Sequence, residues 1–129
     1  MAALADKTGT GIWRRGTGVT NNMIKRTGGR VLVEALAING VNTIFGVPGE
    51  SYLEALDAIY ERPDMLYVTC RQEGGAAFMA EAHAKLTSQP GVCFVTRGPG
   101  ASNACIGVHA AYQNSTPLIL LIGQVPRRN

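Results

Sequence analysis

Four short apolar segments, separated by stretches with helical spacing, constrain the fold of this chain more than any other feature. The segment at residues 92–96 reads Val-Cys-Phe-Val-Thr, and the one at 118–122 reads Leu-Ile-Leu-Leu-Ile. Strands that are apolar on both faces lie inside a covered sheet, and strands that alternate with helices are typically parallel. We therefore predict an α/β fold on a parallel sheet, with strands at residues 41–47, 65–69, 92–96 and 118–122.

The segments between these strands have the three- and four-residue spacing of helices. Thr27 or Gly28 can begin the first helix, and Gly40 can end it. Further helices are expected at about residues 52–61, from a first turn at Glu73, and at 102–114. This pattern predicts a flavodoxin-like open sheet with helices on both faces. Apolar residues recur at helical spacing in the first helix (Val31, Leu32, Ala35, Leu36, Ile38), and those expected to face inward in the second are Leu53, Leu56 and Ile59.

Three loops should meet at one edge of such a sheet. Right-handed crossovers place residues 48–51, 70–73 and 97–102 at the carboxyl ends of the strands. Ligands of open α/β sheets bind at that edge. The sequence therefore predicts a binding site there.

Glu73 is the acidic residue of this predicted edge that most invites a chemical role. It lies in the first turn of its helix, where a carboxylate faces unpaired backbone N–H groups and the positive end of the helix dipole. For a lone acid at such a position, a plain helix-start function is the favoured interpretation until the rest of the chain is considered. Further along the helix, a face of small residues allows another backbone to approach closely, and it comprises Ala76, Ala77, Ala80 and Ala84.

Size and charge exclude several function classes. A chain of 129 residues with 46% hydrophobic residues is sufficient for one domain with a core. The net charge of +3 is concentrated in residues 1–26, which carry +4, so the remainder carries −1 and is not expected to bind nucleic acid. No apolar stretch is long enough to predict a membrane span.

Three cysteines without C-x-x-C spacing indicate buried thiols in a reducing compartment, and we expect a cytoplasmic protein.

The first 26 residues lack helical or strand periodicity. We interpret them as a disordered or non-native extension, with a mis-assigned start upstream of Met23 or a transit peptide as alternatives. Residues 27–129 are then the folded domain.

The glycine loop at residues 98–103 does not match a nucleotide-binding motif. It has Asn103 where a dinucleotide fingerprint needs its third glycine, and no G-K-[ST] occurs in the chain. His83 and His109 lack ligands at matched spacing, so we expect partly buried structural histidines and no metal site.

Several motifs occur in collinear order along the chain. They are Phe45-Gly46-Val47-Pro48-Gly49, Arg71-Gln72-Glu73-x-x-Ala76-x-x-Met79-Ala80, Gly98-Pro99-Gly100-Ala101-x-Asn103, Thr116-Pro117, and Gly123-Gln124-Val125-Pro126-Arg127-Arg128. Together these motifs resemble the N-terminal, pyrimidine-binding domain of thiamine-diphosphate (ThDP)-dependent enzymes, most of all the acetolactate synthase branch. The resemblance runs from about Lys25 to the last residue.

This resemblance implies a role for each matched residue. Glu73 corresponds to the acid that hydrogen-bonds N1′ of the cofactor's aminopyrimidine and thereby promotes removal of the thiazolium C2 proton. The implied cofactor-binding residues are Pro48, Gly49, Glu73, Pro99, Gly100 and Asn103, and those implied on the substrate side are Glu50, Gln113 and Gln124. For Gln113 a solvent-facing position is the favoured interpretation.

The resemblance also implies what lies elsewhere. These enzymes bind the diphosphate and Mg²⁺ through a Gly-Asp-Gly…Asn motif on a second domain, and the motif does not occur here. FAD is present in some relatives. We therefore interpret the chain as a truncated pyrimidine-binding domain of a lyase or carboligase for 2-keto acids, which forms a homodimer or homotetramer when complete. The chain alone should be inactive and weakly stable, with its Ala-rich face exposed. The alternatives are a separate pyrimidine-domain subunit with a diphosphate-binding partner, and a non-catalytic interaction module.

Overall fold

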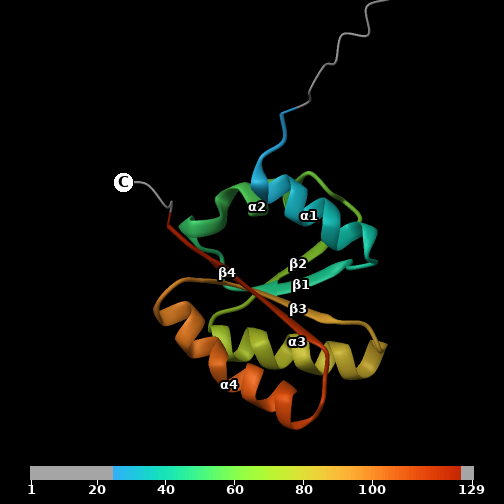
Figure 1. Cartoon of the computed structure of the whole chain (residues 1–129), viewed down its shortest axis with the longest axis vertical. Helices are drawn as coiled ribbons and strands as arrows, with labels where there is room; N and C mark the ends of the chain where they lie inside the picture. Colours follow the sequence, from blue (N-terminus) through green and yellow to red (C-terminus); the bar gives the residue numbers. More distant parts are fainter. Residues whose placement is uncertain (1–24, 126–129) are drawn as a thin grey trace, which may run out of the picture.

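A computed structural model describes residues 25–125, and these form one four-stranded parallel sheet between two pairs of helices (Figure 1). The strand order is β2-β1-β3-β4, so β2 and β4 are the edge strands. The predicted α/β fold with helices on both faces is confirmed. The elements are α1 (Gly28–Ile38), β1 (Thr43–Gly46), the short 3₁₀ helix η1 (Glu50–Tyr52), α2 (Leu53–Tyr60), β2 (Leu66–Thr69), α3 (Glu73–Thr87), β3 (Gly91–Thr96), α4 (Pro99–Gln113) and β4 (Leu118–Gly123).

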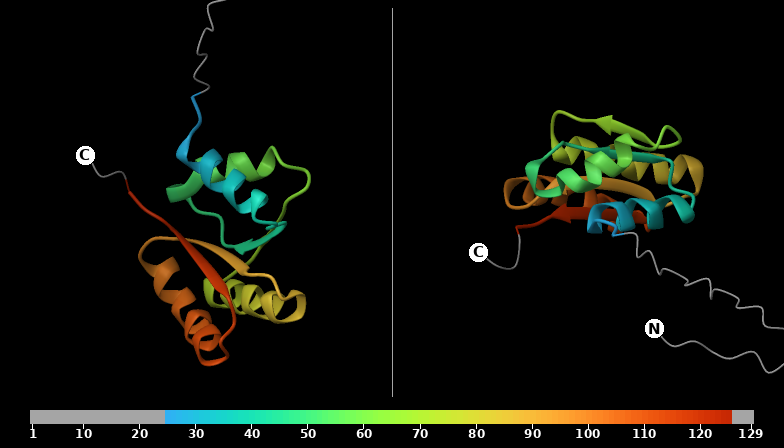
Figure 2. Two further views of the ribbon diagram at one scale, coloured as in Figure 1. Left: turned by 45° about the vertical axis from the view of Figure 1, so that its right-hand side comes forward. Right: turned by 90° about the horizontal axis from the view of Figure 1, so that it is seen from above.

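The two helix pairs cover opposite faces of the sheet (Figure 2). Strand β3 shows the division, because Val92 and Phe94 pack towards α1 and α2 while Cys93 and Val95 pack towards α3 and α4. All four side chains are buried. The sheet thus has two cores, as its apolar central strand predicted.

Helix α1 begins where the sequence indicated, but its buried face differs from the expected one. The Thr27 side chain caps the helix by accepting from the backbone N–H of Arg30. Val33 and Leu36 are its buried residues, whereas Val31 and Ile38 are 52% and 85% exposed. In α2 the expectation for Leu53 was wrong, because Leu53 is 59% exposed and the preceding Tyr52 is buried.

The small-residue face of α3 is buried within the chain, contrary to the expectation that it would be exposed. Ala76, Ala77 and Ala80 are fully buried against the sheet and α4. A Cβ added to Gly107 of α4 would lie 2.4 Å from the Ala77 Cβ, so the two helices already lie as close as their side chains allow. The predicted close approach is therefore confirmed, and α4 is the partner.

The fourth helix begins three residues earlier than predicted. Pro99 occupies its first turn, where the missing N–H has no consequence, and Gly98 precedes it with a φ of 63° that favours glycine. The parallel register aligns Gly46 with Thr69 and Phe94, and Thr96 with Gly123. The carboxyl ends of all four strands therefore meet at one edge, as predicted.

Candidate functional site

Glu73 is held at this carboxyl edge by the capped start of α3 and by a contact from α4. It is the first residue of α3, and the Gln72 side chain caps the helix by accepting from the backbone N–H of Gly75 at 2.8 Å. The Asn103 side-chain amide of α4 donates to Oε2 of Glu73 at 3.0 Å. Among residues 25–125, Oε1 of Glu73 has no hydrogen-bond partner, so it is free to engage a ligand. The carboxylate is partly buried.

Gly100 keeps the space beside this carboxylate open, and Gly49 lies close to the neighbouring Thr96. A Cβ on Gly100 would lie 3.4 Å from Oε1 of Glu73 and 2.9 Å from Cγ2 of Thr96. A Cβ on Gly49 would lie 3.0 Å from the Cβ of Thr96. Thr96 at the end of β3 therefore lies between the two glycine loops, and any larger residue at either glycine would crowd it.

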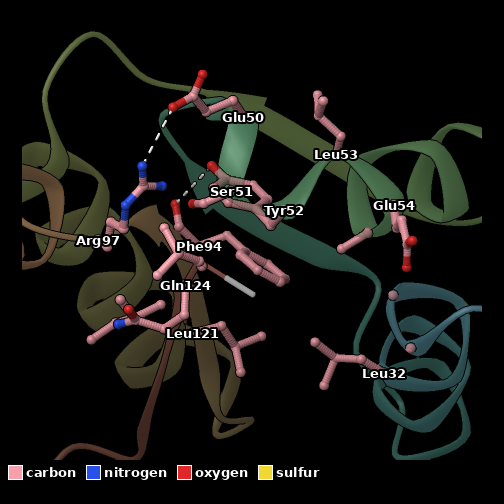
Figure 3. A pocket seen from close by; sticks show the side chains of 16 residues that line it. Leu32, Glu50, Ser51, Tyr52, Leu53, Glu54, Phe94, Arg97, Leu121 and Gln124 are labelled. Atoms are coloured by element: carbon pink, nitrogen blue, oxygen red, sulfur yellow. Dashed lines mark hydrogen bonds and ion pairs between the residues drawn. The ribbon is translucent and has the colours of Figure 1, made fainter. Parts of the chain in front are cut away.

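A second group of polar side chains lies on the α1 and α2 side of the same edge. Ser51 and Thr96 share a hydrogen bond of 2.7 Å between their hydroxyl oxygens. The Arg97 guanidinium lies 3.6 Å from the Glu50 carboxylate, and Figure 3 shows the two facing each other across the rim. Because Glu50 is largely exposed, this pair is weak and open to exchange.

A cavity of about 720 Å³ opens beside these residues (Figure 3). Tyr52 and Phe94, whose rings stack at 4.6 Å, form part of its wall together with Leu32 and Leu121. Glu50 and Gln124 line it, and Glu73 does not. Ser51 of the cavity wall is hydrogen-bonded to Thr96, which also lies close to Gly100 beside the carboxylate.

The structure brings most of the predicted site residues together at this edge. Pro48 and Gly49 lie between β1 and η1, and Pro99, Gly100 and Asn103 lie in the first turns of α4. Gln113 does not join them, because it is the exposed last residue of α4, about 15 Å along the helix from Asn103. The sequence interpretation placed Ser51 and Arg97 in loops at this edge but gave them no role. It did not place Tyr52 or Thr96 there, although Thr96 was recognisable as the residue where an apolar strand ends.

Two tyrosines, Tyr52 and Tyr67, contact each other at the carboxyl edge of the sheet. The Tyr52 hydroxyl donates to the Val47 carbonyl and lies 3.2 Å from the hydroxyl of Tyr67. Burial raises the pKa of both phenols, so both remain neutral. A Cβ on Gly46 would lie 2.4 Å from the Tyr67 hydroxyl, which leaves no room for another residue in that position.

The solvent exposure of the cysteines and histidines differs in part from the prediction. Cys70 and Cys93 are buried thiols as expected, and burial raises the pKa of Cys93 to about 12. Cys105 is exposed, so the expectation of three buried thiols was wrong for it. His83 is partly buried and its ring lies 5.6 Å from that of Phe45, whereas His109 is exposed on α4.

Within residues 25–125 no three His, Cys, Asp or Glu side chains lie close enough to hold a metal ion. None of the helices described is long and apolar enough to cross a membrane.

Comparison with known proteins decides which family this edge belongs to. Residues 26–129 match the family model for the thiamine pyrophosphate enzyme, N-terminal TPP binding domain. The chain belongs to the thiamine pyrophosphate enzyme family. Thiamine pyrophosphate is the same molecule as ThDP, so the resemblance seen in the motifs is confirmed.

Acetolactate synthases are among the relatives of this chain. It is 42% identical over 103 residues to the chloroplastic acetolactate synthase of Arabidopsis thaliana, a match covering 80% of this chain and 15% of that protein. It is 41% identical over 101 residues to the probable acetolactate synthase large subunit of Methanocaldococcus jannaschii, covering 78% and 17%. For the acetolactate synthase of Arthrospira platensis the identity is 42% over 108 residues, covering 81% and 19%. The chain thus spans less than a fifth of the length of these relatives.

Proposed function

We propose that this chain supplies the pyrimidine-binding half of a ThDP site in an acetolactate-synthase-like enzyme, with Glu73 as the acid that engages the aminopyrimidine ring. The observation that carries the proposal is the Glu73 carboxylate itself. Its Oε2 is held by Asn103, its Oε1 is free among the described residues, and the space beside it is kept open by Gly100. This arrangement fits a ring nitrogen that accepts a proton from a carboxyl group.

ThDP supplies the carbanion chemistry by which 2-keto acids are decarboxylated or joined. The part of this chain is to bind and orient one end of the cofactor and to hold a proton at N1′. Glu73 provides the proton, and Asn103 fixes the direction in which its carboxylate points. Pro48, Gly49, Pro99 and Gly100 provide backbone that a flat ring can approach closely.

The neighbouring cavity suits the substrate side of such a site. Its wall combines the Tyr52, Phe94 and Leu121 side chains with the polar groups of Glu50, Arg97 and Gln124. A small 2-keto acid has an apolar end and an anionic end, and this mixture of surfaces matches both. We assign Glu50 and Gln124 to this side, and we assign no role to Gln113.

Further parts of the proposal concern the complete protein. Mg²⁺ and the diphosphate would be held by a second domain, and FAD is a possible additional cofactor of this branch. A homodimer or homotetramer is supported by the outer faces of α3 and α4, which pack side by side and each leave large apolar side chains exposed. These side chains are Phe78, Met79, Ile106 and Tyr112. The cytoplasmic location stays a prediction, since named relatives include chloroplastic and mitochondrial proteins.

The experiment that tests the proposal measures acetolactate formation from pyruvate, with ThDP and Mg²⁺, in the complete enzyme. Glu73→Gln keeps the size of the side chain and removes its acid, so we expect activity to fall by about 10²–10⁴-fold. Glu61→Gln, at the exposed end of α2 and outside the lining of the cavity, is the matched control and should leave the activity near that of the wild type. Equal activity in the two variants would reject the role of Glu73.

A further inference from the structure

Glu81 is the buried charged side chain of the described residues, with only 6% of its surface exposed. A carboxylate in that position needs compensation from several donors. Its Oε1 accepts from Nζ of Lys85 at 2.7 Å, from Oγ1 of Thr116 at 2.9 Å and from Nδ2 of Asn114 at 3.1 Å. The Lys85 hydrogen bond, with support from Thr116 and Asn114, outweighs burial and lowers the pKa of Glu81. The group is therefore ionised at neutral pH.

The donors to Glu81 come from the end of α4 and the turn that follows it. Asn114 is the residue that closes α4, and its backbone N–H donates to the Ala110 carbonyl. The backbone N–H of Thr116 donates to the Ala111 carbonyl at 2.8 Å. Both donors are thus fixed to the last turn of α4, so the hydrogen bonds of Glu81 attach α3 to that turn.

Two carboxylate–amide contacts therefore join α3 to α4. Glu73 accepts from Asn103 near the start of both helices, and Glu81 accepts from Asn114 at the end of α4. The two carboxylates are eight residues apart, or about 12 Å along α3. The helices lie side by side in both views of the chain (Figures 1 and 2).

The contact between α3 and α4 along this stretch is made mainly by small residues. These are Ala76, Ala77 and Ala80 on α3 and Ala104 and Gly107 on α4, with the larger Ile106 close to Gly74, and α3 also packs on apolar side chains of the sheet. Small side chains allow a close approach, but they interdigitate less deeply than large ones and resist sliding or rotation less. Directional hydrogen bonds supply what such an interface lacks.

We propose that Glu81 is a positioning residue for Glu73: its bonds to Asn114 and Thr116 fix α3 against α4, so that the Glu73 carboxylate meets Asn103. The catalytic meaning of this inference rests on the proposed function of Glu73, because a group that exchanges a proton with a ligand must be held within a fraction of an ångström. The geometric content can be tested without catalysis.

The test follows the side-chain amide of Asn103 by NMR in the isotope-labelled 129-residue chain. The Asn103 signal in Glu73→Ala defines the position expected when the Glu73–Asn103 bond is lost. In Glu81→Ala we expect the Asn103 signal to move most of the way to that position. In Glu81→Gln, which keeps an oxygen acceptor for Asn114 and Thr116, it should stay near the wild-type position. The matched control is Glu34→Ala, which removes a partly exposed carboxylate paired with Arg26 and Arg30 on the far side of the sheet.

An Asn103 signal at its wild-type position in Glu81→Ala, together with a lower unfolding temperature, would overturn the inference and leave Glu81 a purely structural residue. If Glu81→Ala does not fold, the double variant Asn114→Ala/Thr116→Val decides the question, because it removes the same bonds from the α4 side. Activity of the complete enzyme tests the proposed function separately. An unchanged Glu73→Gln activity would reject the catalytic role of Glu73, while a shifted Asn103 signal would still support the positioning by Glu81.

Discussion

Two glycines of the α3/α4 pair should respond to the same substitution in opposite directions. Gly75 lies on the exposed side of α3, and a Cβ added there would find no atom closer than 3.9 Å. Gly107 lies inside the α3/α4 interface, where a Cβ would meet the Ala77 Cβ at 2.4 Å and the Ala77 carbonyl carbon at 2.9 Å. Carbon atoms pack at about 3.5–4.0 Å, so Gly107→Ala requires the helices to separate by roughly 1 Å or more.

The two contributions to each change can be estimated. Gly→Ala within a helix is worth about 0.5–1 kcal/mol of stability, because the unfolded chain loses conformational freedom. Overpacking a close interface costs about 1–3 kcal/mol. Gly75→Ala should therefore stabilise by up to about 1 kcal/mol. The 2.4 Å approach at Gly107 places its overpacking cost in the upper part of the range, at ~2–3 kcal/mol, so Gly107→Ala should destabilise by a net ~1–2.5 kcal/mol.

Urea unfolding measures both values. With an m-value of about 2 kcal/mol/M, the midpoint should rise by up to ~0.5 M in Gly75→Ala and fall by ~0.5–1.25 M in Gly107→Ala. The m-value should stay constant, which shows that the change lies in stability. A midpoint that rises equally in both variants would refute the close α3/α4 contact.

Other consequences of the structure can be checked independently. The pKa of Glu81 is lowered in the folded chain, so its contribution to the free energy of unfolding should be present above the ordinary glutamate range and disappear as the pH falls through the folded pKa. In urea titrations at different pH values, Glu81→Gln should lose that part of the acid dependence. A pH profile of stability identical to that of the wild type would contradict this prediction. Iodoacetamide should modify Cys105 in the folded chain and spare Cys70 and Cys93, as mass mapping would show, whereas equal labelling of all three would contradict the burial. Gly100→Val should weaken ThDP binding to the complete enzyme far more than Gly28→Val, because a side chain at residue 100 crowds Glu73 and one at residue 28 does not. Calorimetric titration of ThDP measures both affinities, and equal affinities would contradict the prediction.

The sequence was sufficient to predict the sheet, because the apolar strands and their alternation with helices left few other arrangements. It could not choose the buried face of α1, since nearly every residue from Val31 to Ile38 is apolar. Packing decides that question: Gly29 lies so close to α2 that a Cβ would meet the Ala55 backbone nitrogen at 2.5 Å, and this contact turns Val33 and Leu36 inward. Tyr52 rather than Leu53 fills the core because it stacks on Phe94 from a distant strand.

The candidate site was also predictable only where its residues have a local sequence signal. The position of Glu73 at the start of a helix follows from local pattern. Its contact with Asn103 joins residues 30 apart and was not predicted, since the family resemblance implied only that both residues lie beside the cofactor. The start of α4 at Pro99 was missed because proline and glycine were taken as loop signals, although proline suits the first turn of a helix. The bonds of Glu81 to Asn114 and Thr116 have no local signature at all. The expected extension at residues 1–26 falls almost wholly outside the described residues and remains a prediction, as does the domain at 27–129.

The central claim is that the Glu73 carboxyl group activates the cofactor, and hydrogen–deuterium exchange at C2 of ThDP bound to the complete enzyme tests it most directly. This measurement reports proton removal from the cofactor before any keto acid reacts. The account predicts rapid exchange in the wild type and in Glu61→Gln, and exchange in Glu73→Gln that is slowed to nearly the rate of free ThDP. Near-normal exchange in Glu73→Gln, with ThDP bound and the fold intact, would contradict it.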